Sequence, residues 1–128
     1  MSIRIVRLGT KRASGEGLRL GTVRRPPRGV PKEQFSSGNW YDVWYPVLAP
    51  SAALMKSAFE AQTGKQWAAF FRKFRSEMNV PAASQSLDVL AALSHHANLS
   101  LGCYCADESH CHRSQLRALL LERGAALE

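Results

Sequence analysis

The chain has 128 residues, of which 45% are hydrophobic and 21% charged, and its formal net charge is +7. This length fits a single domain, residues 1–128, that buries enough surface to fold without a metal ion or a disulfide. No run approaches the ~20 apolar residues that cross a membrane, and the first residues lack the apolar segment of a signal peptide, so we expect a cytoplasmic protein without a membrane partner.

The positive charge is concentrated in the first quarter of the chain. Residues 1–32 hold nine basic side chains against one acidic side chain, a net charge of +8, whereas residues 33–128 carry a net charge of −1. Such a local excess favours a binding site for an anion over a generally basic surface.

Two strands are predicted in this basic quarter. Residues 3–8 and 18–24 are rich in β-branched and aliphatic side chains, and turn residues follow each of them. Two consecutive prolines, which lack the N–H of a strand ladder, end the second strand and stiffen the loop 24–31. The aromatic residues 40–45 fit either a short strand or a loop.

Helices dominate the remaining sequence. The expected elements, in chain order, are a helix over 51–63 with Ser51 as its N-cap, a helix over 67–78 with an aromatic stripe, a helix from Ser84 or Ser86 to about 95, a strand over 99–104, and a helix from about Ser109 to 123. Strands separated by helical stretches pair in parallel. The sequence therefore predicts an α/β fold, a small layered domain with a mostly parallel sheet of about three to four strands flanked by helices.

Residues of types that can catalyse reactions or bind ligands follow two of these strands. The second strand ends at Arg24 and the stiff loop that bears Arg28, and the last strand is followed by a segment rich in cysteine and histidine, 103–114. Sites in parallel sheets form at the carboxyl ends of strands. If these two ends are neighbours, they create a pocket of cysteine, histidine and arginine side chains.

A reactive thiol is the first hypothesis for this pocket. Cys111 is expected in the first turn of the last helix, where the helix dipole and basic neighbours favour the thiolate. The free N–H groups of that turn would help to hold an anion, such as a phosphate-bearing small molecule or the end of a nucleic acid. The candidate catalytic residues are Cys111 or Cys105 as nucleophile or redox thiol and His112 as base, and the candidate anion-binding residues are Arg24, Arg28 and Arg113.

Three other hypotheses stay open. The cysteines are buried apolar residues without a role. The protein is a nucleic-acid-binding module that uses its basic first quarter. Alternatively, the segment holds a structural zinc ion. Cys103 and Cys105 would lie on the same face of the last strand, so both could point to one ion. The ligands would come from the cysteines and from His110 or His112, and the preferred set is Cys103, Cys105, Cys111 and His110. Apart from this zinc ion, no cofactor is expected.

Four segments also carry a family resemblance. They are 21–32 with its Pro-Arg-Gly loop, 40–44, 48–51, and 102–114 with its Cys-x-Cys and Cys-His-Arg motifs. Together they resemble the bacterial family domain of unknown function 488 (DUF488) over essentially the whole chain, although Val23 stands where many members have Asp. The resemblance implies a small α/β fold and names no reaction. The residues that it carries over are Arg24, Pro27, Arg28, Gly29, Cys103, Cys105, Cys111, His112 and Arg113.

Overall fold

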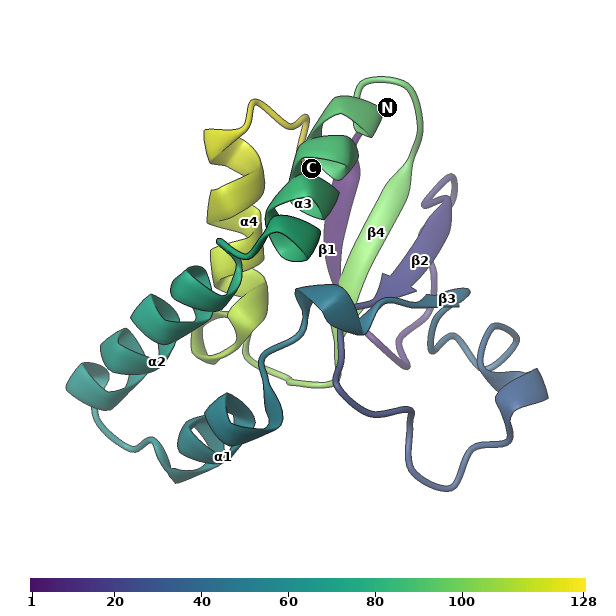
Figure 1. The fold of residues 1–128 in the computed structure, drawn as a ribbon. Helices are drawn as coiled ribbons and strands as arrows, with labels where there is room; N and C mark the ends of the chain where they lie inside the picture. The colour runs from purple at the N-terminus through teal and green to yellow at the C-terminus, as the bar shows by residue number, and fades with distance from the viewer.

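Four parallel strands form one sheet in the order β1-β4-β2-β3 (Figure 1). The structure is a computed structural model that describes residues 1–128. The strands are β1 (Ile3–Arg7), β2 (Leu18–Gly21), β3 (Val43–Trp44) and β4 (Leu99–Cys103). The last strand in the sequence lies between the first two, so the segments that follow β2 and β4 meet at one edge. The predicted α/β class with a parallel sheet is confirmed.

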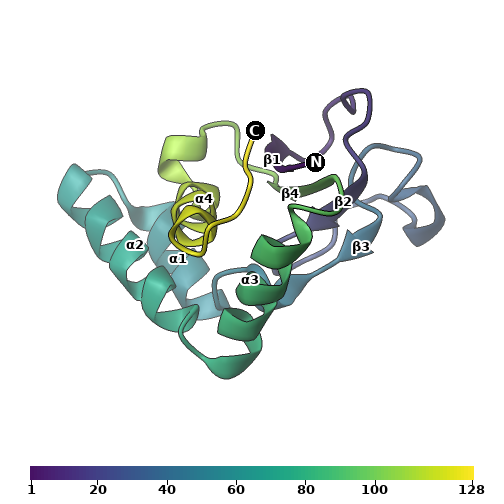
Figure 2. The same ribbon diagram turned by 90° about the horizontal axis from the view of Figure 1, so that it is seen from above.

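Four helices lie on the same side of this sheet (Figure 2). They are α1 (Ala52–Glu60), α2 (Gly64–Glu77), α3 (Pro81–Leu93) and α4 (His112–Glu122), with short 3₁₀ turns at Lys32–Gln34, Pro46–Leu48 and Glu108–His110. The Ser51 hydroxyl caps α1 by accepting from the Leu54 N–H, and Thr63 and Gln66 form a capping box at the start of α2. No helix combines the length and the apolar character needed to span a membrane.

The main core lies between the helices and one face of the sheet. Strand side chains Ile3, Leu99 and Leu101 pack there against Phe74 from α2 and Leu116 from α4, and all five are nearly inaccessible to solvent. The aromatic stripe of the second predicted helix thus faces the core, as its spacing indicates.

Loops cover the other face of the sheet. Gly21 and Gly102 are paired in register on this face, and a Cβ atom on Gly21 would lie 2.4 Å from the ring of Tyr41. Because these two glycines have no side chain, Tyr41 and Leu8 lie directly on the sheet. Beside them, the buried Arg19 guanidinium pairs with Glu16 at 2.8 Å.

Several predicted element boundaries differ from those in the structure. Strand β2 ends at Gly21 rather than residue 24, because the chain then leaves the sheet and Arg24 bonds to carbonyls before α1. Helix α3 begins at Pro81, whose fixed φ suits the first helical position and whose missing N–H is not needed there.

The start of the last helix also differs from its prediction. Asp107 caps a 3₁₀ turn by accepting from the Ser109 N–H, and α4 begins only at His112. Cys111 is therefore the N-cap rather than a first-turn residue. Cys105 lies beyond the end of β4 and not on the strand itself.

Candidate functional site

The candidate site lies at the edge where β2 and β4 end. The two strands are neighbours and pair Gly21 with Gly102, so the segments that follow them run side by side. The Thr22 carbonyl, just after β2, lies 2.7 Å from Nε2 of His112 at the start of α4. The structure thus brings together the two sequence segments that were expected to form one pocket.

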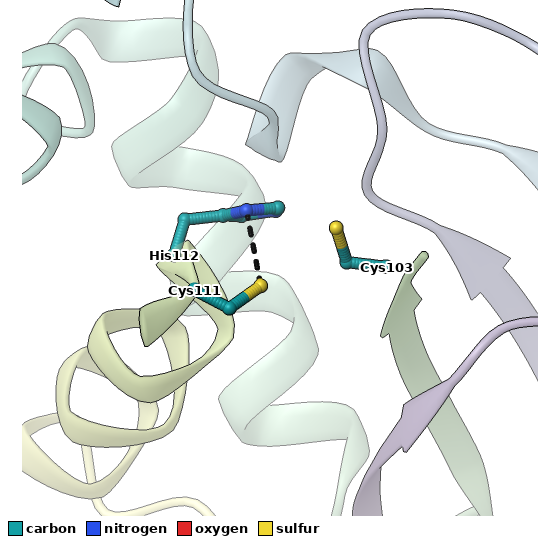
Figure 3. A group of neighbouring side chains, drawn as sticks. All are labelled: Cys103, Cys111 and His112. Carbon is teal, nitrogen blue, oxygen red and sulfur yellow. Dashed lines mark hydrogen bonds between the residues drawn. The ribbon is translucent and has the colours of Figure 1, made fainter. Parts of the chain in front are cut away.

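Three buried side chains form a thiol–imidazole cluster, which consists of Cys103, Cys111 and His112. Cys103 comes from the end of β4, whereas the other two come from the start of α4, and all three point toward one another (Figure 3). The two sulfur atoms and a ring nitrogen all lie within 4.8 Å of one another. The distance from Cys111 Sγ to His112 Nδ1 is 3.7 Å.

A backbone contact fixes which nitrogen of His112 carries the proton. A carbonyl oxygen only accepts hydrogen bonds, so Nε2 must donate to the Thr22 carbonyl. In the neutral ring, Nδ1 then keeps its lone pair on the side of the thiols. His112 can serve there as a base or as a metal ligand.

Arg113 places a buried positive charge beside the cluster. Its side chain is 3% exposed, and its Nε donates to Cys111 Sγ at 3.4 Å. The two remaining guanidinium nitrogens donate to the Val6 and Cys105 carbonyls at 2.8 and 2.7 Å. The structure therefore turns this predicted anion-binding residue toward a thiol and the backbone.

The three thiols differ in their tendency to ionise. Interactions with the thiols of Cys103 and Cys105, and with the His112 ring, hold the pKa of Cys111 well below its ordinary range although burial opposes this. Hydrogen bonds with Cys105 and Cys111, together with burial, raise the pKa of Cys103. For Cys105, the hydrogen bond with Cys103 lowers the pKa, but the one with Cys111 and burial raise it more. Negative charge is therefore most stable on Cys111.

A cavity of about 890 Å³ opens above the cluster. Cys103, Cys105 and His112 line it, whereas Cys111 does not and is only 2% exposed. Met55 and Phe59 of α1 add an apolar wall. Every charged side chain in the lining is basic, namely Arg7, Arg24, Arg25, Arg28 and Lys56.

The predicted anion-binding arginines of the loop 24–31 have unequal surroundings. Arg24 is half-buried and donates to the carbonyls of Pro46, Ala49 and Pro50 at 3.0–3.2 Å. Arg28 is exposed and belongs to none of the ion pairs of the chain, as is also true of Arg25. Arg28 and Arg25 therefore offer free guanidinium groups, whereas most donors of Arg24 hold the chain before α1.

The family comparison covers both segments of the site. A family model described as the active DUF488-N3 subclade matches residues 3–124. The chain belongs to the DUF488 family. This match confirms the resemblance carried by the Pro-Arg-Gly loop and the Cys-His-Arg motif of this DUF488 protein. No curated protein and no solved structure matches the chain.

One residue of the preferred zinc set lies away from the other ligands in this DUF488 protein. The exposed ring of His110 stacks on Trp67, with ring centres 4.8 Å apart, and its Nδ1 lies 3.5 Å from Asp107. His112 joins Cys103 and Cys111 instead. Cys105 Sγ lies 3.8 Å from Cys103 Sγ, at the exposed side of the cluster.

Sequence reasoning missed some residues of the site. Arg7 ends β1 and donates to the Tyr104 carbonyl at 3.2 Å, so the rule that sites form at the carboxyl ends of strands also applies to it. Thr22 follows β2 directly and is covered by the same rule. Lys56 has no such signal, because only the placement of α1 brings it to the cavity.

Proposed function

We propose that this DUF488 protein binds a phosphate-bearing anion in the cavity and that the thiol–imidazole cluster is the reactive group the anion meets. The observation that carries this proposal is the charge of the lining: five basic side chains and no carboxylate among 20 residues. With no internal counter-charge in the lining, an anion from solution is the natural partner of these side chains.

The size and lining of the cavity support a small organic ligand. Its volume of about 890 Å³ lies within the range of roughly 300–1,000 Å³ typical of small-molecule sites. The apolar wall formed by Met55 and Phe59 faces the same space as the basic residues. An anion with an organic portion would therefore use both surfaces.

The positions of the cysteines suggest how they would take part. Cys105 is the exposed cysteine and lines the cavity, so a bound ligand would contact its sulfur first. Cys111 lies behind the lining and would act indirectly, through the effect of its negative charge on Cys103 and His112. In an enzymatic reaction without a bound metal ion, His112 Nδ1 would be the base nearest to the thiols.

The charge distribution favours this pocket over an extended nucleic-acid surface. Phosphate backbones are bound by basic side chains that are free to contact them. In this chain, Arg12 and Arg19 are held by Asp42 and Glu16, and Arg4 pairs with Glu128. Three of the nine basic side chains of the first quarter are thus neutralised within the fold.

Calorimetric titration with inorganic pyrophosphate tests the proposal. We expect binding to the unmodified protein and an affinity at least about tenfold lower in the double variant Arg25→Ala/Arg28→Ala, because a hydrogen bond to a charged group contributes roughly 1.5–3 kcal/mol. Arg4→Ala/Lys11→Ala is the matched control, since it removes two positive charges of the same first quarter from outside the cavity.

Two results would contradict the proposed pocket. One is the absence of pyrophosphate binding by the unmodified protein. The other is equal weakening in the test and control double variants, which would indicate attraction to net charge. A short single-stranded DNA titrated under the same conditions should bind no more tightly than pyrophosphate, whereas much tighter binding would favour the nucleic-acid module.

A further inference from the structure

We infer that Cys103, Cys111 and His112 bind one zinc ion and leave its fourth coordination position open to the cavity. Two thiolate sulfurs and one imidazole nitrogen are ligands that zinc prefers. Three protein ligands with an open fourth position are typical of zinc sites that act on bound molecules, whereas structural sites are closed by four protein ligands. Metal binding here does not depend on the anion-binding proposal.

The spacing of the ligand atoms agrees with a tetrahedral ion. With Zn–S and Zn–N bonds of about 2.3 and 2.05 Å, neighbouring ligands are about 3.8 Å apart for two sulfurs and about 3.6 Å for sulfur and nitrogen. The observed distance from Cys111 Sγ to His112 Nδ1 is 3.7 Å. No pair among the three ligand atoms exceeds 4.8 Å, so small side-chain movements suffice.

The surroundings of His112 match those of a metal ligand. Metal-bound histidines usually donate their other ring N–H to a carbonyl or carboxylate, which fixes the orientation of the ring. His112 does so toward the Thr22 carbonyl at 2.7 Å, and this leaves Nδ1 directed at the thiols. The ligand set is therefore held in place by the backbone after β2.

The charge balance favours an anion at the fourth position. On binding, the Cys103 and Cys111 thiols each release one proton to solvent and form a sulfur–zinc bond, while neutral His112 binds through Nδ1. Two thiolates cancel the charge of the ion, and the buried Arg113 guanidinium adds one positive charge at 3.4 Å from Cys111 Sγ. Hydroxide or a phosphate oxygen would complete this site better than a neutral ligand.

The position of the cluster leaves one side of the ion accessible. Cys103 and His112 line the cavity, so an ion between them faces the same space as the basic side chains. Cys105 stands at this side, with its sulfur 3.8 Å from that of Cys103 but outside the three-ligand group. It provides a matched control, because it is a cysteine of the same segment that we do not assign as a ligand.

The first experiment measures metal content and cobalt substitution. The purified, reduced protein should contain about one zinc ion per chain. Replacement by Co²⁺ should produce the visible bands of a tetrahedral site and thiolate-to-cobalt charge transfer. Cys103→Ser and Cys111→Ser should lower the Co²⁺ affinity at least about 100-fold, since even loss of an outer-shell partner costs 10–100-fold, whereas Cys105→Ser should retain the spectrum.

A second measurement needs no variant and so remains decisive if a serine variant fails to fold. Alkylation of the unmodified protein, followed by mass spectrometry of its peptides, should label Cys105 alone with zinc present, and chelation without unfolding should make Cys103, which also lines the cavity, reactive. Absence of zinc together with failure to bind Co²⁺ would overturn the site. Protection of Cys105 equal to that of Cys111, or loss of the spectrum in Cys105→Ser, would show a closed four-ligand site and overturn the open position.

Inorganic pyrophosphate then tests whether the open position faces the anion site. It should change the visible spectrum of the Co²⁺ protein, and no change at saturating pyrophosphate would overturn the open position. In Arg25→Ala/Arg28→Ala, the Co²⁺ spectrum should persist, while the pyrophosphate response should need at least about tenfold more ligand. A protein that binds Co²⁺ but not pyrophosphate would refute the proposed function and leave the metal site standing.

Discussion

Two groups of arginines from the same stretch of sequence have opposite surroundings. Arg12 and Arg19 pack at the loop-covered face of the sheet, where each meets a carboxylate, Asp42 or Glu16, at 2.8 Å. The cavity arginines, represented by Arg28, lie in a lining that contains no acidic side chain. The first group holds loops onto the sheet, whereas the second keeps its charge for a partner outside the chain.

This difference shows why a net charge is a poor guide to a binding surface. Glu16 is the single acidic residue among the first 32, yet it neutralises the most buried arginine. Asp42, from a later segment, neutralises a second one. The unpaired basic side chains that remain are fewer and mostly gather in the cavity, and five variants can test whether the two groups are truly separate.

The largest expected effect belongs to the buried pair. Arg19→Met should lower the free energy of unfolding by about 3–5 kcal/mol, because it leaves the Glu16 carboxylate buried without its partner. Urea denaturation at pH 7 measures the loss. A loss below about 1 kcal/mol would show that this arginine does not hold the fold together.

Acid should weaken the same face of the sheet. Burial alone would raise the pKa of Asp42, but hydrogen bonds from Arg12, the Arg19 N–H and Ser36 lower it to about 2. Because the pKa is lower in the folded state, the stabilisation is complete above the ordinary value of 3.8 and is lost as the pH falls through about 2. We expect the free energy of unfolding to fall by about 2 kcal/mol over this pH range, as measured by denaturation at a series of pH values.

Asp42→Asn is the variant that isolates this pH effect. It should flatten the decline between about pH 5 and pH 2 by the contribution of that carboxyl group, since an amide does not titrate in this range. If the free energy of unfolding of this variant falls with pH as steeply as that of the unmodified protein, another group causes the acid sensitivity. One such group is Glu16, whose pKa is also lowered by its partners.

Arg24 should show properties of both groups. Arg24→Met removes hydrogen bonds to three carbonyls and should cost about 1–2 kcal/mol of stability, and it should also weaken pyrophosphate binding. In Arg28→Ala, by comparison, stability should stay within about 0.5 kcal/mol while binding weakens. Parallel denaturation and calorimetry check this, and a purely structural Arg24 would leave the affinity unchanged.

The smallest effect is expected at the surface. Arg4 pairs with Glu128 at 2.9 Å, but both side chains are substantially exposed. Arg4→Ala should therefore change stability by less than about 1 kcal/mol and leave pyrophosphate affinity unchanged. A clear loss of affinity would mean that charge at a distance, rather than contact in the cavity, governs binding.

Much of the fold could be predicted because its signals are local. The β-branched runs, the aromatic stripe of α2 and the Ser51 cap depend on residues close in sequence. The start of α3 at Pro81 was missed because the residues after it are small and show no apolar periodicity. The β2 boundary was missed because the tertiary contacts of Arg24, not the residues of the strand, draw the chain out of the sheet.

The candidate site could be predicted only as two segments. The spacing of cysteines and histidines marks the segment after β4, and the prolines mark the loop after β2. Whether His110 or His112 faces the thiols depends on where α4 begins. The 3₁₀ turn before this helix directs His112 inward and leaves His110 stacked on Trp67. The contribution of Lys56 depends on how α1 packs, which no local pattern specifies.

The proline-rich loop 24–31 has a consequence for the entropy of binding. Its three prolines have fixed φ angles, and its backbone is anchored where Tyr104 Oη donates to the Arg25 carbonyl at 2.8 Å. A loop that is already ordered gives up few backbone conformations when a ligand arrives. The ordering cost then falls on the side chains of Arg25 and Arg28, and most of their interaction with an anion is retained as affinity.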